Sequence, residues 1–77
     1  MNKTTRKKLS EIIDELQPLK DTLEELADEE QEKADNMPEN MQSSEKHDQY
    51  EEIADKLRDA SSDLESVIDE IQEAIDL

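Results

Sequence analysis

Apolar residues recur in this chain at alternating intervals of three and four, and this spacing limits the available folds more than any other feature. In the first half it joins Leu9, Ile12, Leu16, Leu19, Leu23 and Leu26. In the second half it joins Tyr50, Ile53, Leu57, Ala60, Leu64, Val67, Ile71 and Ala74. Such spacing places side chains along one stripe of an α-helix, as at the a and d positions of a coiled coil. The sequence therefore predicts two long helices.

A polar segment separates the two periodic regions. It reads Asn36-Met37-Pro38-Glu39-Asn40-Met41-Gln42-Ser43-Ser44. Proline disfavours helix at the preceding residue and serine is a preferred N-cap, so Ser43 or Ser44 is expected to start the second helix. We predict one all-α domain over residues 1–77, a two-helix antiparallel hairpin that resembles a coiled coil. Its helices are expected at about 4–35 and 44–76, with the connection at about 36–43.

Pro18 is the one residue that argues against an unbroken first helix. A proline ring meets the carbonyl four residues back and costs about 3 kcal/mol in a helix interior. Pro18 lies on the solvent side between Leu16 and Leu19, so we expect a kink there, with the stripe resuming beyond it. The alternative is a true break, in which Pro18 opens a new helix.

Folding the chain at the middle of the connection pairs positions whose numbers sum to about 83. This register sets Ile12 beside Ile71, Leu16 beside Val67, Leu19 beside Leu64, and Leu26 beside Leu57. It also carries the basic start of the chain, residues 3–8, alongside its acidic end. Each charged cluster alone lies at a helix end where the macrodipole disfavours it, so packing them together offsets both mismatches.

A third column of apolar residues lies beside this stripe, and a single two-helix seam does not cover it. Its members are Ile13, Ala27, Ala34, Ala54, Ile68 and Ile75. An apolar stripe three columns wide is typical of a helix in a bundle of more than two helices. We therefore expect Ile13, Ile68 and Ile75 to contact a partner protein or a second copy, the latter giving a homodimeric four-helix bundle.

Net charge bears on the class of partner. The chain has 24 acidic and nine basic residues, and its formal charge is −15. Such a field repels nucleic acid and anionic membranes, and it favours encounter with basic surfaces, including those that bind nucleic acid. Asp28, Glu29, Glu51 and Glu52 are candidate members of an acidic face. This face either mimics the charge of nucleic acid or only solvates the outer surface of the helices.

Few residues offer catalytic or metal chemistry. His47 lies beside Asp48 and one turn before Glu51, which is compatible with a general base held by a carboxylate. The other interpretation is a solvent-exposed polar residue in the first helical turn. Without cysteine or glycine the chain offers no thiolate metal site, calcium loop or phosphate-binding loop. We predict a non-enzymatic protein without cofactor or metal, which binds a protein or itself.

The connection carries two methionines, Met37 and Met41. Methionines in an exposed turn form an adaptable contact surface. Alternatively both fold back over the end of the hairpin core, where Glu30 and Lys33 interrupt the stripe. The absence of cysteine, and of an apolar segment of roughly 20 residues, favours a cytoplasmic location.

Three segments carry a resemblance to a known family. They are the opening Asn2-Lys3-Thr4-Thr5-Arg6-Lys7-Lys8-Leu9, the middle from Asp28-Glu29-Glu30-Gln31-Glu32 through the connection to Glu45, and the tail Ile71-Gln72-Glu73-Ala74-Ile75. The sequence resembles short, acidic, uncharacterised helical-hairpin proteins from phages, prophages and mobile elements of Firmicutes. The resemblance implies a mobile-element origin and no established activity. It raises the expectation of a small inhibitor of a host nucleic-acid enzyme or defence complex.

Overall fold

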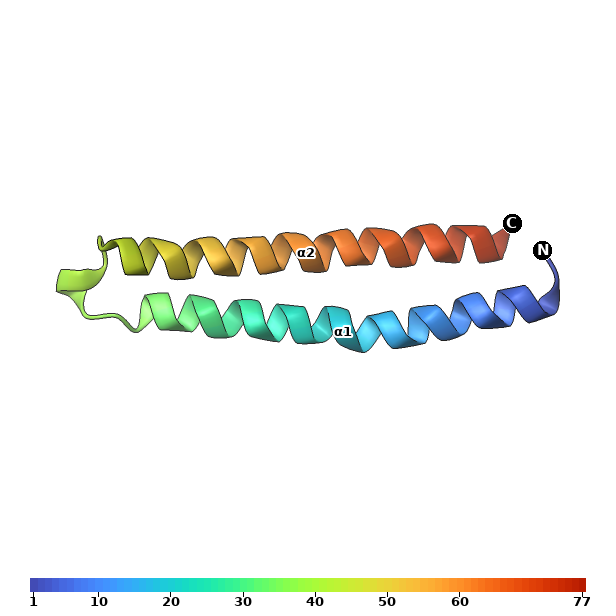
Figure 1. The fold of residues 1–77 in the computed structure, drawn as a ribbon, viewed down its shortest axis with the longest axis horizontal. Helices are drawn as coiled ribbons and strands as arrows, with labels where there is room; N and C mark the ends of the chain where they lie inside the picture. The colour runs from blue at the N-terminus through green and yellow to red at the C-terminus, as the bar shows by residue number, and fades with distance from the viewer.

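In a computed structural model, residues 1–77 form two long helices joined by a short connection. Helix α1 spans Lys3–Asp35, the 3₁₀ turn η1 spans Glu39–Met41, and helix α2 spans Glu45–Asp76. The helices run side by side in opposite directions, with both termini at one end and η1 at the other (Figure 1). The molecule is a rod whose Cα atoms extend over 60 × 15 × 12 Å. The predicted all-α hairpin is confirmed.

Side-chain caps mark the start of both helices. The Asn2 side chain accepts a hydrogen bond from the Thr5 amide at 2.8 Å. Ser44, one of the two predicted caps, accepts from the His47 amide at 3.2 Å. Each bond satisfies one of the free amides of a first helical turn. Because no residue has a positive φ, the connection turns without glycine.

Helix α1 continues through Pro18, so the alternative of a true break is wrong. Figure 1 shows one continuous ribbon with a slight bend in its cyan part. Proline removes one backbone donor from the helix. The Pro18 carbonyl accepts an added hydrogen bond from Thr22 Oγ1 at 2.9 Å.

Two columns of each helix form the seam. One is the half of the predicted stripe that contains Leu16 and Leu57, and the other is the apolar column that was predicted to lie outside the seam. On α1 its members are Leu9, Ile13, Leu16, Lys20, Leu23, Ala27, Glu30 and Ala34. On α2 they are His47, Tyr50, Ala54, Leu57, Ser61, Leu64, Ile68, Ile71 and Ile75. All are buried or half-buried, whereas Ile12, Leu19, Leu26, Ile53 and Val67 are exposed by 37–57%.

The predicted side-chain pairing is therefore wrong, although the antiparallel register is close. Each of the four predicted pairs contains one exposed member. Contacts across the seam join Arg6 to Ile75, Lys20 to Ser61, and Lys33 to Tyr50. These residue numbers sum to 81–83, near the predicted 83. The helices are rotated about their axes from the prediction, with little shift along them.

Small side chains explain which column forms the seam. Ala27, Ala34 and Ala54 are completely buried, and Ser61 is 2% exposed. The hydroxyl of Ser61 lies 3.5 Å from the backbone oxygen of Lys20 on the other helix. A contact from so short a side chain to a backbone requires the two helices to lie close together. Leucine and isoleucine at these positions would hold them farther apart.

The basic start of the chain contacts the end of α2 through a backbone group. Arg6 Nε donates to the Ile75 carbonyl at 3.1 Å, in the last turn of α2, which has no basic residue of its own. A cation at this position is favoured by the helix macrodipole. No ion pair within 4.0 Å joins Lys3, Lys7 or Lys8 to the acidic end. The basic start therefore lies beside the end of α2, as predicted, but the contact is a hydrogen bond to a backbone carbonyl and not an ion pair.

Ile68→Ala tests the position of the seam. Ile68 is 6% exposed, so its truncation is expected to lower the free energy of unfolding by about 2–4 kcal/mol. The adjacent Val67→Ala, at an exposed position, is the control and is expected to cost less than about 1 kcal/mol in dilute protein. Urea unfolding followed by circular dichroism measures both. A larger loss at Val67 would contradict the observed seam.

Candidate interaction surfaces

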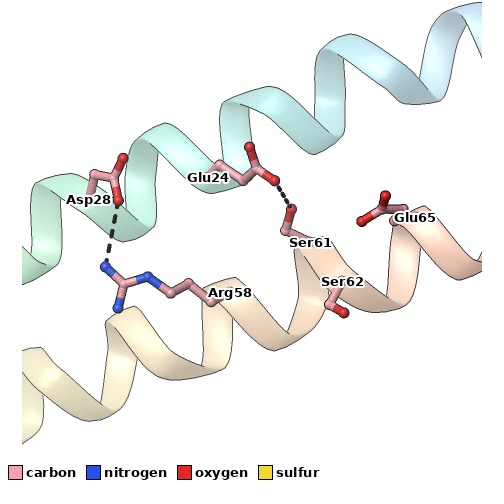
Figure 2. Close-up of a pocket in the computed structure, with 6 residues that line it drawn as sticks. All are labelled: Glu24, Asp28, Arg58, Ser61, Ser62 and Glu65. Atoms are coloured by element: carbon pink, nitrogen blue, oxygen red, sulfur yellow. Dashed lines mark hydrogen bonds and ion pairs between the residues drawn. The ribbon is translucent and has the colours of Figure 1, made fainter.

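On one side of the seam, which we call the polar side, hydrogen bonds and an ion pair join the two helices. Arg58 of α2 donates to Gln31 Oε1 at 3.3 Å and lies 3.5 Å from Asp28 Oδ1, both on α1. Figure 2 shows Arg58 pointing across to Asp28, and Ser61 pointing to Glu24. The cross-helix polar contacts in this region therefore lie on one side of the rod.

Glu24 is the centre of this polar side. It accepts from Lys20 Nζ at 3.1 Å and from Ser61 Oγ at 3.1 Å. The hydrogen bond from Lys20, and after it that from Ser61, holds the pKa of Glu24 below its ordinary value. The same bond raises the pKa of Lys20. Both groups are therefore held in their charged forms at neutral pH.

A shallow groove of about 300 Å³ lies over these residues, and no hydrophobic residue lines it. Its six lining residues are those drawn in Figure 2: Glu24, Asp28, Arg58, Ser61, Ser62 and Glu65. The carboxylate nearest the Ser61 hydroxyl is Glu24, whose lowered pKa makes it a weaker base. The arrangement suits a link between helices better than an activated nucleophile.

An apolar strip lies on one side of the hairpin and is formed by one column of each helix, whose members are exposed except for the half-buried Ala74. We define it as Ile12, Leu19 and Leu26 of α1 with Ile53, Ala60, Val67 and Ala74 of α2. Within each row the spacing is seven residues, which is two helical turns. Because the seam repeats at the same interval, each row runs alongside it.

Two lysines show that both rows lie on the same side. Lys33 extends the α1 row by seven residues, and Lys46 extends the α2 row in the same way. Their Nζ atoms each lie 5.9 Å from the centroid of the Tyr50 ring. The rows therefore flank the same edge of the seam, and the polar contacts of Arg58 and Glu24 lie along its other edge.

The apolar strip, and not the column of the predicted contact residues, is the apolar surface that the hairpin leaves exposed. Ile68 is buried in the seam of the hairpin, and Ile13 and Ile75 are half-buried there. The expectation that the hairpin leaves this column uncovered is wrong, because that column contains the small residues at which the helices pack. The sequence nevertheless indicated correctly that one of three apolar columns stays exposed, although the exposed column is the one with Leu19.

His47 is buried in the seam, with 8% of its surface exposed, so the expectation of a solvent-exposed residue is wrong. Its Nδ1 has no hydrogen-bond partner. Asp48 lies 3.7 Å from Nδ1, and Glu51 lies 3.6 Å from Nε2. The three residues form the one group whose ligand atoms, all within 4.8 Å, could hold a metal ion. Asp48 and Glu51 lie nearest different ring nitrogens of His47.

The two methionines of the connection have different environments. Met37 is half-buried at the end of the hairpin, and its carbonyl accepts from Gln42 Nε2 at 2.8 Å. Met41 is 40% exposed. The partial burial of Met37 agrees with the alternative of folding back, whereas Met41 lies exposed in the turn.

The four candidate acidic residues do not share one face. Asp28 lies beside Arg58 on the polar side, and Glu51 is half-buried near His47. Glu29 and Glu52 are exposed without a cation in ion-pair range. Six of the 24 acidic residues lie within 4.0 Å of a lysine, arginine or histidine nitrogen, which leaves 18 without one.

No protein-family model, curated protein or solved structure matches this sequence. Neither helix has a stretch long and apolar enough to cross a lipid bilayer. The features of the molecule that bear on its function are therefore the acidic surface, the polar side and the apolar strip.

Glu24→Gln is expected to lower the free energy of unfolding near neutral pH. A lowered pKa in the folded state means that this stabilisation is fully present above the ordinary value of 4.5. It is lost as the pH falls through the lower folded-state value. The difference between wild type and variant should therefore shrink toward zero on acidification, which urea unfolding across pH measures. Glu25→Gln, at an exposed position without a partner, is the control, and a difference that persists in acid would count against the Glu24 contacts.

His47→Leu is expected to raise the free energy of unfolding by about 1–2 kcal/mol, because it removes a buried nitrogen that lacks a partner. Thermal and urea unfolding measure the change. His47→Asn, which keeps a polar group at the same place, should give no such gain. A less stable leucine variant would mean that the imidazole makes favourable interactions in its buried position.

Proposed function

We propose that this protein is a non-enzymatic acidic binding protein that occupies a basic, nucleic-acid-binding surface of another protein. The observation that best supports this function is the excess of 18 carboxylates without a nearby cation. Four of the nine basic residues lie in the first eight positions, and Lys20, Lys33 and Arg58 already pair with carboxylates. Most of the rod therefore presents uncompensated negative charge.

The density of this charge is close to that of duplex DNA. The 33 residues of α1 extend over about 50 Å at 1.5 Å per residue. Distributed along a hairpin of that length, 24 carboxylates give about one per 2 Å, against one charge per about 1.7 Å of duplex. A basic groove that binds phosphates would be attracted to such a rod, most strongly at low salt.

The predicted resemblance to mobile-element proteins favours an inhibitory role, and we place this role in the cytoplasm. A small acidic protein that covers a nucleic-acid-binding surface would block the host protein without any catalytic step. We therefore place the action of this chain in competition with nucleic acid for one site.

A second candidate function is that of a structural bundle or coiled-coil adapter, and the apolar strip favours it. Leu19 is 57% exposed, and Ile12, Leu26 and Val67 are each 43% exposed. Apolar side chains gathered on one side of a monomer commonly mark an interaction site. We propose that a second copy covers them in a homodimeric four-helix bundle. The acidic outer faces would remain free to bind, so the two functions are compatible.

Capture from a Firmicutes lysate at low and high salt tests the first function. Recovery of a nucleic-acid-binding protein that elutes with competing duplex DNA is the expected result. Combined Glu29→Gln, Glu32→Gln and Glu52→Gln substitutions should weaken this binding and its dependence on salt. Ser10→Ala, Gln17→Ala and Gln49→Ala together leave the charge unchanged and provide the control. Capture that resists high salt, or recovery of this chain alone, would contradict the proposal.

A further inference from the structure

We infer that two copies pack through their apolar strips with their connections at opposite ends, so that like helices pack on like helices. This inference rests on the second proposed function and adds the surface, the symmetry and the contacts to it. The axis of the dimer would cross the strip near Leu19 and Ala60. Of the 18 carboxylates lacking partners, the contact uses Glu29 and Asp63, both at its rim.

The shape of the strip favours a second hairpin as its occupant. Both helices contribute an exposed apolar row, and the rows lie side by side along the same edge of the seam. Helices that carry two seam columns and a third apolar column are typical of four-helix bundles. A face built from two parallel rows is matched by another face of the same kind.

The available area is enough for a specific dimer. With the polar residues that continue it at each end, Thr5 and Lys33, the α1 row covers 28 residues, or about 42 Å at 1.5 Å per residue. The Cα atoms of the two helices span 15 Å across the plane seen in Figure 1. A face of these dimensions buries roughly 600 Å² per copy, and two copies therefore bury about 1,200 Å², the lower end for stable interfaces.

Charge selects the relative direction of the two copies. Residues 28–52, at the connection end, contain ten acidic residues and two lysines. At the open end, the four basic residues of 1–8 balance the four acidic residues of 69–77. Copies with their connections together would place two strongly negative ends side by side. The opposite direction places each negative end beside a neutral one.

The symmetry of the two rows agrees with this direction. Ile12 and Leu26 each lie seven residues from Leu19, so a two-fold axis at Leu19 places Ile12 beside Leu26 of the second copy. Ile53 and Val67 are related in the same way about Ala60. Every large residue of the strip then meets another large residue, and Ala60 meets its own copy.

Charges at the rim of the strip also become complementary. Lys8 and Glu29 flank the α1 row on its outer edge, 11 residues before and ten after Leu19. The axis therefore brings Lys8 near Glu29 of the second copy. On α2 the same operation brings Lys56 near Asp63. With the connections together, Asp63 would instead lie near Glu15, which is unfavourable.

Sedimentation tests the dimer. The wild-type chain is expected to be a dimer, and Leu19→Ser should weaken self-association at least about tenfold while circular dichroism remains helical. Gln17→Ser, on the polar side, is the control and should leave the dimer intact. A wild-type chain that is monomeric at all concentrations would overturn the inference and the second function. Salt-sensitive capture of a basic protein tests the first function separately.

Disulfide trapping tests the direction, because the natural chain has no cysteine. A mixture of Ile12→Cys and Leu26→Cys variants should form the mixed disulfide rapidly. A mixture of Leu26→Cys and Ile53→Cys variants should not, since those positions face each other only when the connections lie together. Rapid trapping of the second pair would overturn the inferred direction and leave the dimer, and with it the second function, in place.

Discussion

The structure depends on the close approach of α1 and α2 at four small residues in one column of the seam. Ala27, Ala34, Ala54 and Ser61 are almost completely buried, and Ser61 reaches the backbone of the opposite helix. Because the chain is short and has one aromatic residue, the hairpin has no large core. The helices are held by close packing of their backbones and not by large buried side chains. Because this column lies in the seam, the large apolar residues of the strip, such as Leu19 and Leu26, remain at the surface.

The rotation of the helices also divides the surface by chemistry. One edge of the seam carries Glu24, Arg58 and their hydrogen-bonding partners, which link the helices and keep Glu24 charged. The other edge carries the apolar strip. Beyond both edges the carboxylates face water. The charged surface proposed to bind a basic partner and the apolar strip proposed to bind a second copy thus lie in separate places.

Much of this architecture could be predicted from the sequence because periodicity and polar breaks are local properties. The helices begin and end within about a residue of the expected positions, and Ser44 is the predicted kind of cap. The choice between the two outer columns could not be made, since both are apolar and the column with Leu19 and Leu26 is the bulkier. Counting apolar bulk favours that column, whereas close helix packing favours the one with Ala27 and Ala54. The burial of His47 could not be predicted for the same reason, because His47 lies in the same column as Ala54.

The most direct test of the account is the set of methyl contacts made by the alanines of α1, measured by nuclear Overhauser effects in solution. Packing of this column in the seam predicts cross-peaks from the Ala27 and Ala34 methyl groups to residues of α2 within the same chain. Isotope-filtered spectra of mixed labelled and unlabelled protein separate these from contacts between copies. Alanine methyl groups without such contacts, with Leu19 and Leu26 packed on α2 of their own chain, would contradict it.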